Sequence, residues 1–196
     1  MQVPDLLTPS VVEPMLRGRL GRPHLHVARC ASTQLLLASN APEGALATAD
    51  EQWAGRGRLG RKWHAPRGTS LLCSTVLRPA VEAARLPELS LVAGRACAEA
   101  IASVTGLEPQ LKFPNDVLIG GRKASGILAE ATEGRVVLGI GVNVNVPAEE
   151  LPTDVALPAT SLLVETAAPV SRALLLVTLL ECLEHHYDAW VRRARS

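Results

Sequence analysis

The amino-acid sequence predicts an α+β fold: a mixed, mostly antiparallel sheet with helices on one face. The first observation is a series of short apolar runs, bounded by glycine, proline and asparagine, with the length and composition of strands. The second is two longer Ala- and Leu-rich segments, residues 86–104 and 172–193, that favour helices. Runs of consecutive strands with separate helices between them are typical of this class.

Length, charge and cysteine pattern exclude several classes of protein. With 196 residues, the chain is expected to form one domain over residues 1–196 around a single core. A net charge of +1 provides no polycationic field for non-specific nucleic-acid binding, so no DNA partner is expected. The four cysteines form no C-x-x-C pair and have no histidine at ligand spacing, which argues against a zinc site and a disulfide framework.

The sequence also lacks targeting and membrane signals. Its N-terminal residues have neither the basic nor the apolar region of a signal peptide, and the longest apolar stretch, residues 174–180, is far shorter than a membrane span. We therefore expect a cytoplasmic protein with no membrane partner.

Local signals predict the elements of the first half of the chain. The expected elements are a short helix at 11–19 broken by Pro14, a strand at 24–30, a helix N-capped by Ser32, and a strand at 45–50. They are followed by a buried strand at 70–77 and a helix at 86–104 that Gly106 ends.

The second half is expected to complete the sheet and close with a helix. Its predicted strands are 111–113, 117–119, 123–131 and 136–144, the last two joined by a Glu133-Gly134 turn. Residues 147–169 are rich in proline and small residues and are expected to form a surface connection with one helical turn. Ser171 should then cap a closing helix at 172–193, with its core face formed by Leu174, Leu175, Val177, Leu179, Leu180 and Leu183.

The most unusual segment is residues 55–63, Gly-Arg-Gly-Arg-Leu-Gly-Arg-Lys-Trp, which we call the basic loop. A solvated surface loop is one interpretation, and an Arg-Gly nucleic-acid contact is a second. The third is a nucleotide clamp, because glycines let backbone N–H groups approach phosphates and guanidinium groups bind them bidentately. Its glycine content predicts a loop that orders around a ligand.

Three further motifs have both a structural and a functional interpretation. Lys-Phe-Pro-Asn-Asp at 112–116 is either a strand-ending turn or a site where the Lys pairs with an anion and Asp116 holds Mg²⁺ or a ribose hydroxyl. Lys123 is either an edge lysine or a positive charge directed into a pocket, where Gly126 would let a ligand lie against the backbone. Gly-Ile-Gly-Val-Asn at 139–143 is either a bulge or a strand that directs Asn143 to a nucleotide.

Taken together and in this order, the motifs resemble the biotin protein ligases, from about Val27 to the end of the chain. The resemblance rests on Ser32-Thr33, Gln52, the basic loop, residues 112–116, residues 122–128 and residues 139–143. The basic loop is the most specific of these, because the related lipoate ligases lack it. The resemblance implies a catalytic domain similar to those of class II aminoacyl-tRNA synthetases.

The resemblance implies an ATP-dependent ligase. Such enzymes join biotin and ATP to give biotinyl-5′-AMP and pyrophosphate, with Mg²⁺ accompanying ATP, and then transfer biotin to a lysine of a biotin carboxyl carrier protein. The alternative is a module that binds biotin or biotinyl-adenylate with impaired transfer. Retention of Lys123 and of the loop arginines favours the active enzyme, since these cations would reduce the repulsion between the biotin carboxylate and the α-phosphate.

The resemblance also implies a role for each matching residue. Those implied to bind biotin are Ser32, Thr33, Gln52, Gly55, Arg56, Arg58, Lys123 and Gly126. Those implied to bind the nucleotide are Arg58, Arg61, Trp63, Lys112, Asn115 and Asn143, with Trp63 either stacking on adenine or anchoring the loop. Lys123, Arg58 and Arg56 are the implied catalytic residues, and Asp116 is the implied magnesium ligand.

The sequence departs from the family in a few places. Gln34 stands where Asn usually follows Ser-Thr, and Phe113 replaces a Trp, both mild changes. No N-terminal helix-turn-helix and no small C-terminal β-barrel are expected, so the resemblance implies a monofunctional ligase. Exposed sheet edges in such folds often pair, so both a monomer and a homodimer fit the sequence.

Overall fold

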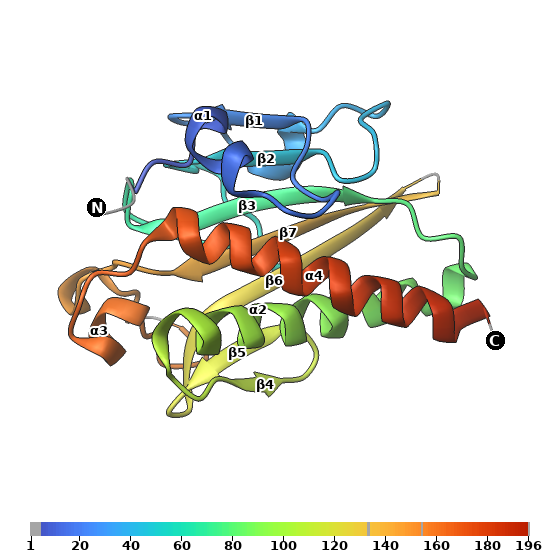
Figure 1. The fold of residues 1–196 in the computed structure, drawn as a ribbon. Helices are drawn as coiled ribbons and strands as arrows, with labels where there is room; N and C mark the ends of the chain where they lie inside the picture. The colour runs from blue at the N-terminus through green and yellow to red at the C-terminus, as the bar shows by residue number, and fades with distance from the viewer. Residues whose placement is uncertain (1–4, 133, 154, 196) are drawn as a thin grey trace.

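The computed structural model describes residues 5–132, 134–153 and 155–195 (Figure 1). In this part of the chain one sheet of seven strands has the order β1-β2-β3-β7-β6-β5-β4. The strands are β1 His24–Val27, β2 Leu46–Ala49, β3 Ser70–Leu77, β4 Gln110–Lys112, β5 Asp116–Ile119, β6 Arg122–Thr132 and β7 Arg135–Asn143. Only β1 and β2 pair in parallel, and the other neighbours are antiparallel, which confirms the predicted mixed sheet.

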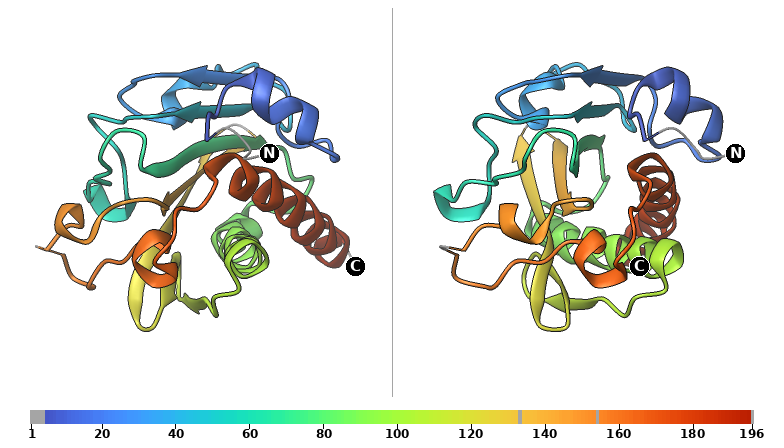
Figure 2. Two further views of the ribbon diagram at one scale, coloured as in Figure 1. Left: turned by 60° about the vertical axis from the view of Figure 1, so that its left-hand side comes forward. Right: turned by 90° about the vertical axis from the view of Figure 1, so that its left-hand side faces the viewer.

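Helices cover one face of this sheet. The α-helices are α1 Pro9–Val12, α2 Leu89–Thr105, α3 Leu162–Thr166 and α4 Arg172–Arg195. Short 3₁₀ helices are η1 Glu13–Met15, η2 Thr33–Leu36, η3 Arg58–Gly60, η4 Ala83–Glu88 and η5 Ala148–Glu150. The long helices α2 and α4 lie side by side against the same face (Figures 1 and 2), as predicted. None of the described helices is long and apolar enough to cross a membrane.

The main core lies between this pair of helices and the sheet. It contains buried side chains of both long helices and of the central strands, including Leu89, Ile101, Leu138, Val142 and Leu179. The predicted core face of α4 is correct except at Leu174, whose side chain is 41% exposed in the first turn of the helix. Ser171 caps this turn as predicted, because its Oγ accepts from the Leu174 N–H at 3.2 Å. A smaller apolar cluster contains Leu37, Ala45, Ala47, Val76 and Val137.

The helix predictions are confirmed in position and corrected in extent. The predicted helix at 11–19 is the α1–η1 pair, which starts at Pro9 and ends at Met15. The helix expected after Ser32 is the single 3₁₀ turn η2, and the Ser32 side chain makes no capping hydrogen bond. α2 starts three residues later than predicted, at Leu89, after a 3₁₀ segment that contains Pro87. Gly106 ends α2 with a φ of 73°, a left-handed conformation that glycine adopts without strain.

The strand predictions differ mainly at the ends. β3 has the predicted bounds, whereas β1 ends at Val27 rather than at Cys30. The pairing nevertheless resumes at an isolated parallel bridge between Cys30 and Gln52, which keeps the two segments side by side. Gly134 turns the chain between β6 and β7 with a φ of 75°, and the predicted turn residue Glu133 lies outside the described residues.

Candidate active site

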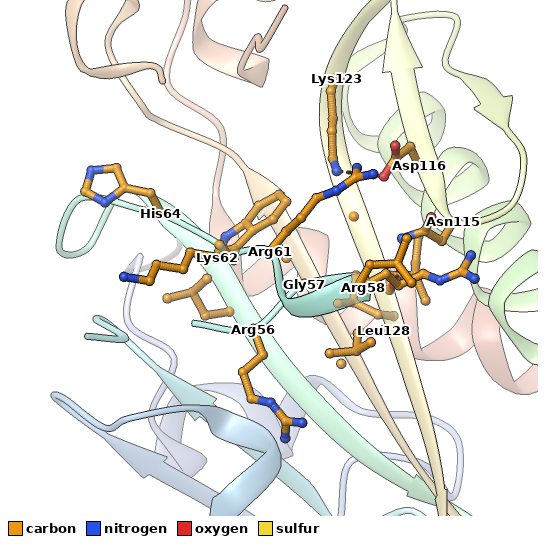
Figure 3. Close-up of a pocket in the computed structure, with 18 of the residues that line it drawn as sticks. Arg56, Gly57, Arg58, Arg61, Lys62, His64, Asn115, Asp116, Lys123 and Leu128 are labelled. Carbon is orange, nitrogen blue, oxygen red and sulfur yellow. Dashed lines mark hydrogen bonds and ion pairs between the residues drawn. The ribbon is translucent and has the colours of Figure 1, made fainter. Parts of the chain in front are cut away.

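The sheet face away from α4 carries the basic loop and the connection that follows β7 (Figure 2). Together with the strands beneath them, these segments enclose a cavity of about 810 Å³. Its lining comes from residues 32–34, Gln52, the basic loop, the β4–β5 turn, strands β3, β6 and β7, Pro152, residues 155–157 and Ala159, and Figure 3 shows part of it. Segments far apart in the sequence therefore converge on one site.

A buried polar cluster forms one part of this cavity. Gln52 Oε1 accepts from the Thr33 backbone N–H at 2.7 Å and from Thr33 Oγ1 at 3.1 Å. Thr33 Oγ1 also lies 2.7 Å from Ser74 Oγ. Ser32 and Thr33 are each only 3% exposed. The cluster thus offers hydroxyl and amide groups from largely buried side chains, which suits a small polar group.

Two glycines make room for the indole of Trp63. Gly126 in β6 and Gly141 in β7 are cross-strand partners. A Cβ on Gly126 would lie 3.0 Å from Cζ3 of Trp63, and a Cβ on Gly141 would lie 2.6 Å from its Cε2. The ring therefore lies directly on the strand backbones. Its Nε1 is buried and has no hydrogen-bond partner among the described residues, so one donor is left unused.

Lys123 shares a face with Gly126 because β6 contains an irregularity. The β5–β6 register shifts between Val117 and Leu118, so that Ala124 has no partner in β5. The Lys123 Nζ would lie 3.3 Å from a Cβ on Gly126, which shows that both residues face the cavity. Strict alternation would place two residues three positions apart on opposite faces of the sheet.

The ammonium group of Lys123 lies between an acid and an aromatic ring. Its Nζ is 2.7 Å from Asp116 Oδ1 and 5.6 Å from the centroid of the Trp63 ring. The side chains of Lys123 and Asp116 are 26% and 13% exposed, so their charges are only partly screened by water. An anionic ligand that enters the cavity would therefore compete with Asp116 for Lys123.

The backbone of Lys123 is held by the connection that follows β7. Its N–H donates to Pro158 O at 2.7 Å, and its carbonyl accepts from the Thr160 N–H at 2.9 Å. Asn143 Nδ2 in turn donates to the Thr160 carbonyl at 3.0 Å. Asn143 is thus linked through Thr160 to the residue that carries the central positive charge of the site.

The β4–β5 turn is fastened to β6 by two reciprocal hydrogen bonds. Asn115 Nδ2 donates to the Ile127 carbonyl at 2.9 Å, and the Ile127 N–H donates to the Asn115 carbonyl at 2.9 Å. This attachment keeps Asp116 within reach of Lys123. Phe113 in the same turn is 76% exposed and forms part of the rim.

The basic loop has a closed hairpin-like backbone. The Trp63 N–H donates to Gly55 O at 2.9 Å, and the Gly57 N–H donates to Arg61 O at 2.7 Å. A Cβ on Gly55 would lie 2.4 Å from the Trp63 carbonyl oxygen, so this close approach requires glycine. Figure 3 shows Arg61 reaching toward Lys123 and Asp116, Arg58 lying near Asn115, and Arg56 turned away from both.

The cavity lining also includes a cysteine, Cys73, and one acidic side chain, Asp116. Cys73 lines the cavity, but burial raises the pKa of its thiol to about 12, with Cys97 contributing in the same direction, so the thiol stays protonated at neutral pH. No group of three or more His, Cys, Asp or Glu side chains in the described ranges could hold a metal ion by itself.

Comparison with known proteins is consistent with this geometry. Residues 27–146 match the biotin/lipoate A/B protein ligase family. The chain belongs to this family. It is 37% identical over 201 residues to the biotin–[acetyl-CoA-carboxylase] ligase of Mycobacterium tuberculosis, a match that covers 95% of this chain and 74% of that protein.

Other biotin ligases are similar over different lengths. The bifunctional ligase/repressor BirA of Bacillus subtilis is 40% identical over 154 residues, which cover 76% of this chain and 47% of that protein. The chain therefore spans about half the length of this relative. A solved structure of biotin protein ligase from Aquifex aeolicus, in complex with biotin and ATP, superposes with a TM-score of 0.80 at 32% identity. That match covers 88% of this chain and 73% of the Aquifex chain, and it confirms the expected catalytic fold.

The cavity brings together the site residues that the biotin ligase motifs predict, with two exceptions. Gly55 lies at the base of the loop, outside the lining, and Asn143 is 5% exposed and does not line the cavity either. Two other predicted residues have specific partners, since Arg56 pairs with Glu130 and the Asn115 amide holds the turn.

Some lining residues were not predicted as site residues from the sequence. Gln34 Nε2 donates to the Leu128 carbonyl at 3.2 Å and to the Val137 carbonyl at 3.3 Å, and its side chain fills the space above Gly139. The missing side chain at Gly139 was a usable signal for that contact. Ser74, in contrast, lies inside a continuous apolar run that gave no sign of a polar role.

Proposed function

We propose that this protein is an ATP-dependent biotin protein ligase. The observation that carries the proposal is the arrangement of one cavity, with a buried hydroxyl and amide cluster, the positive charge of Lys123, and a basic loop over the lining. The family assignment and the Aquifex relative with biotin and ATP support the same conclusion.

Biotin would bind with its ureido ring at the polar cluster of Ser32, Thr33 and Gln52. A ureido ring has two N–H donors and one carbonyl acceptor, which match the mixed character of these side chains. The aliphatic chain of biotin would then pass beside the Trp63 ring, which covers the backbone at Gly126, so that the carboxylate reaches Lys123. That carboxylate would displace Asp116 from the ammonium group.

ATP would bind on the side of the basic loop. Arg58, Arg61 and Lys112 supply cations for the phosphates, and Trp63 supplies a ring for the base. The nucleotide contacts of Asn115 and Asn143 stay predictions, and the hydrogen bonds that both residues make also support the turn and Lys123.

Asp116 fits the magnesium that accompanies ATP. Mg²⁺ is usually held by one or two carboxylates together with substrate phosphates and water, so a single acidic side chain beside the phosphate site is a suitable donor. The ion would supply charge neutralisation on the departing pyrophosphate. Release of Asp116 from Lys123 by the biotin carboxylate would leave this carboxylate available.

The proposed reaction has two steps. In the first, a biotin carboxylate oxygen attacks the α-phosphorus, the bond to the bridging oxygen breaks, and pyrophosphate leaves. Lys123 reduces the repulsion between the two anions at this encounter, which favours the transition state. In the second, the amine of a carrier-protein lysine attacks the acyl carbon, the bond from that carbon to the phosphate oxygen breaks, AMP leaves, and the proton of the amine passes to solvent. Neither step needs a covalent enzyme intermediate, in accord with the protonated Cys73.

The biotin carboxyl carrier protein is the proposed acceptor, and the reducing cytosol is the proposed compartment. All four cysteines are free, and Cys30, Cys73 and Cys97 are buried, which supports a reducing environment.

The proposal is tested with the pure protein, biotin, ATP and Mg²⁺, with and without a biotin carrier domain. We expect pyrophosphate release that requires biotin, and mass addition of one biotin to the wild-type carrier but not to a carrier whose acceptor lysine is replaced by arginine. Lipoate in place of biotin is the substrate control. Adenylate formation without transfer would support a binding module instead, and no biotin-dependent pyrophosphate would refute the proposal.

A further inference from the structure

Arg56 differs from the other cations of the basic loop because it has an acidic partner outside the cavity. Its Nη1 donates to Glu130 Oε2 at 2.9 Å, and its Nη2 donates to Glu130 Oε1 at 2.5 Å. These are two parallel bonds between a guanidinium fork and one carboxylate, the geometry that orients both groups best. Figure 3 shows the Arg56 side chain directed away from Lys123 and Arg61.

Glu130 is attached to a firmly held part of the sheet. It belongs to β6, where it pairs with Val137 of the neighbouring strand β7. Arg56, in contrast, belongs to the base of the loop, next to the Gly55–Trp63 hydrogen bond that closes it. The ion pair therefore connects the start of the loop to a central strand across 74 residues of sequence.

The space around this ion pair is open. A second depression of about 460 Å³ lies between the loop and β6, lined by residues 54–62 together with Leu128 and Glu130. The Arg56 and Glu130 side chains are 46% and 36% exposed. Water and salt reach the pair, so its contribution should be modest and should depend on ionic strength.

We propose that Glu130 is a positioning residue that acts through Arg56. The pair forms a latch that fastens the base of the basic loop to β6 and so holds Arg58, Arg61 and Trp63 over the cavity. Opening of the loop would widen the exit for a bound intermediate, because the loop forms part of the cavity lining. The latch therefore slows the loss of the adenylate before the acceptor lysine arrives. The identity of that intermediate rests on the proposed function.

The latch is tested first in the ligand-free protein by amide hydrogen exchange of the loop peptide. Glu130→Gln keeps the shape of the side chain and removes its charge, and we expect loop exchange about threefold faster at low salt. Arg85→Gln is the matched control, since Arg85 makes a similar bidentate pair with Glu88, at 3.0 and 3.1 Å, at the start of α2. This control should leave loop exchange unchanged. The measurement does not depend on any catalytic activity.

The second test measures the dissociation of biotinyl-adenylate and uses charge reversal. Arg56→Glu and Glu130→Arg should each speed dissociation about threefold to fivefold at low salt, and the double variant should return the rate to near the wild-type value. In Glu130→Arg, whose side chain is not part of the cavity lining, the kcat for adenylate formation should change much less than the dissociation rate. A purely structural role for the pair would shift the melting temperature without this split.

Each outcome decides the matter. Faster exchange and dissociation in both single variants, restored in the double variant, would support the latch. Unchanged rates in the single variants, or changes that the double variant does not restore, would overturn it. If a charge-reversal variant folds poorly, the salt dependence of loop exchange in the wild-type protein and in Glu130→Gln serves instead. Salt should speed exchange more in the wild-type protein than in Glu130→Gln, and equal salt dependence would overturn the latch. Failure to form adenylate would refute the proposed function and leave the exchange result standing.

Discussion

The two faces of the β6–β7 pair differ in the side chains that they carry. Toward α2 and α4, Leu138 and Val142 of β7 are fully buried in the main core, and Ser125 of β6 lies 3.3 Å from the Cys97 thiol of α2. Toward the cavity, the same strands carry Gly126 and Gly141, which leave their backbones bare for the Trp63 ring. One face therefore supplies stability by close packing of side chains, and on the other the two glycines leave room for a ring to lie against the backbone.

This comparison predicts that substitutions on the two faces will affect different properties. The largest effect on the cavity face is expected for Lys123→Ala. Loss of a fixed positive charge at the site of reaction should slow biotin-dependent adenylate formation by about 100-fold or more, which corresponds to about 3 kcal/mol in the barrier. Circular dichroism should show a folded protein. Arg17→Ala, at a highly exposed position, is the control, and an unchanged rate in Lys123→Ala would remove the carboxylate assignment.

On the helix face, Leu138→Ala should show the reverse. Leu138 is 0% exposed, so the truncation leaves a cavity in the main core and should lower the free energy of unfolding by about 3 kcal/mol. Urea unfolding measures this loss. Activity per folded molecule should stay close to that of the wild type, and a large fall would show that the two faces are not independent.

The buried histidine of β1, His24, should make the free energy of unfolding depend on pH. Burial lowers the pKa of His24 to about 4, and the charge of His26 contributes in the same direction. His24 also contacts Thr48, which in turn contacts His26, and His26 lies 3.6 Å from Asp50. His24 takes up a proton near pH 6.5 in the unfolded chain and only near pH 4 in the folded protein. The contribution of neutral His24 to the free energy of unfolding is therefore fully present above about pH 6.5 and is lost as the pH falls from 6.5 to about 4.

The loss attributed to His24 should amount to at most about 3 kcal/mol. Urea unfolding at pH 7.5 and at pH 4.5 should show a smaller difference for His24→Gln than for the wild-type protein. An equal difference in both proteins would assign the acid sensitivity to other groups.

The smallest effect is expected from two matched glycine substitutions. In Gly141→Ala the new Cβ would lie 2.6 Å from the Trp63 ring, so the indole must move, and adenylate formation should fall about tenfold, about 1.4 kcal/mol. In Gly94→Ala, on α2, the new Cβ would meet the ends of two flexible side chains, Leu111 at 2.9 Å and Ile127 at 3.9 Å. That variant should keep its activity. Equal losses in the two variants would contradict the difference between the faces.

The sequence predicted the elements of both faces well where the pattern was local. The continuous apolar run at Ser70–Leu77 and the Ala/Leu-rich helix ending at Gly106 needed no tertiary information. The predicted end of β1 was wrong because pairing beyond Val27 is reduced to a single bridge. The pattern of apolar and polar residues along the chain carries no information about such a loss of pairing.

The site was predictable in its residues and less so in their orientations. Nearly all of the site residues that the motifs predicted line the cavity. The orientation of Lys123 toward Gly126, in contrast, depends on the unpaired Ala124, which follows from the register of β6 with β5. The partner of Arg56 could not be predicted either, because Glu130 lies 74 residues away along the chain. The direction of a side chain depends on contacts with distant parts of the chain, whereas a motif can be recognised from neighbouring residues alone.

The most direct test of the central claim is the biotin-dependent exchange of labelled pyrophosphate into ATP, because it reports adenylate formation alone. We predict exchange that requires biotin and Mg²⁺, that persists in Leu138→Ala at temperatures where the variant is folded, and that is lost in Lys123→Ala. Exchange that is absent from the wild-type protein, or unchanged in Lys123→Ala, would contradict the account of the cavity face as the site of biotin activation.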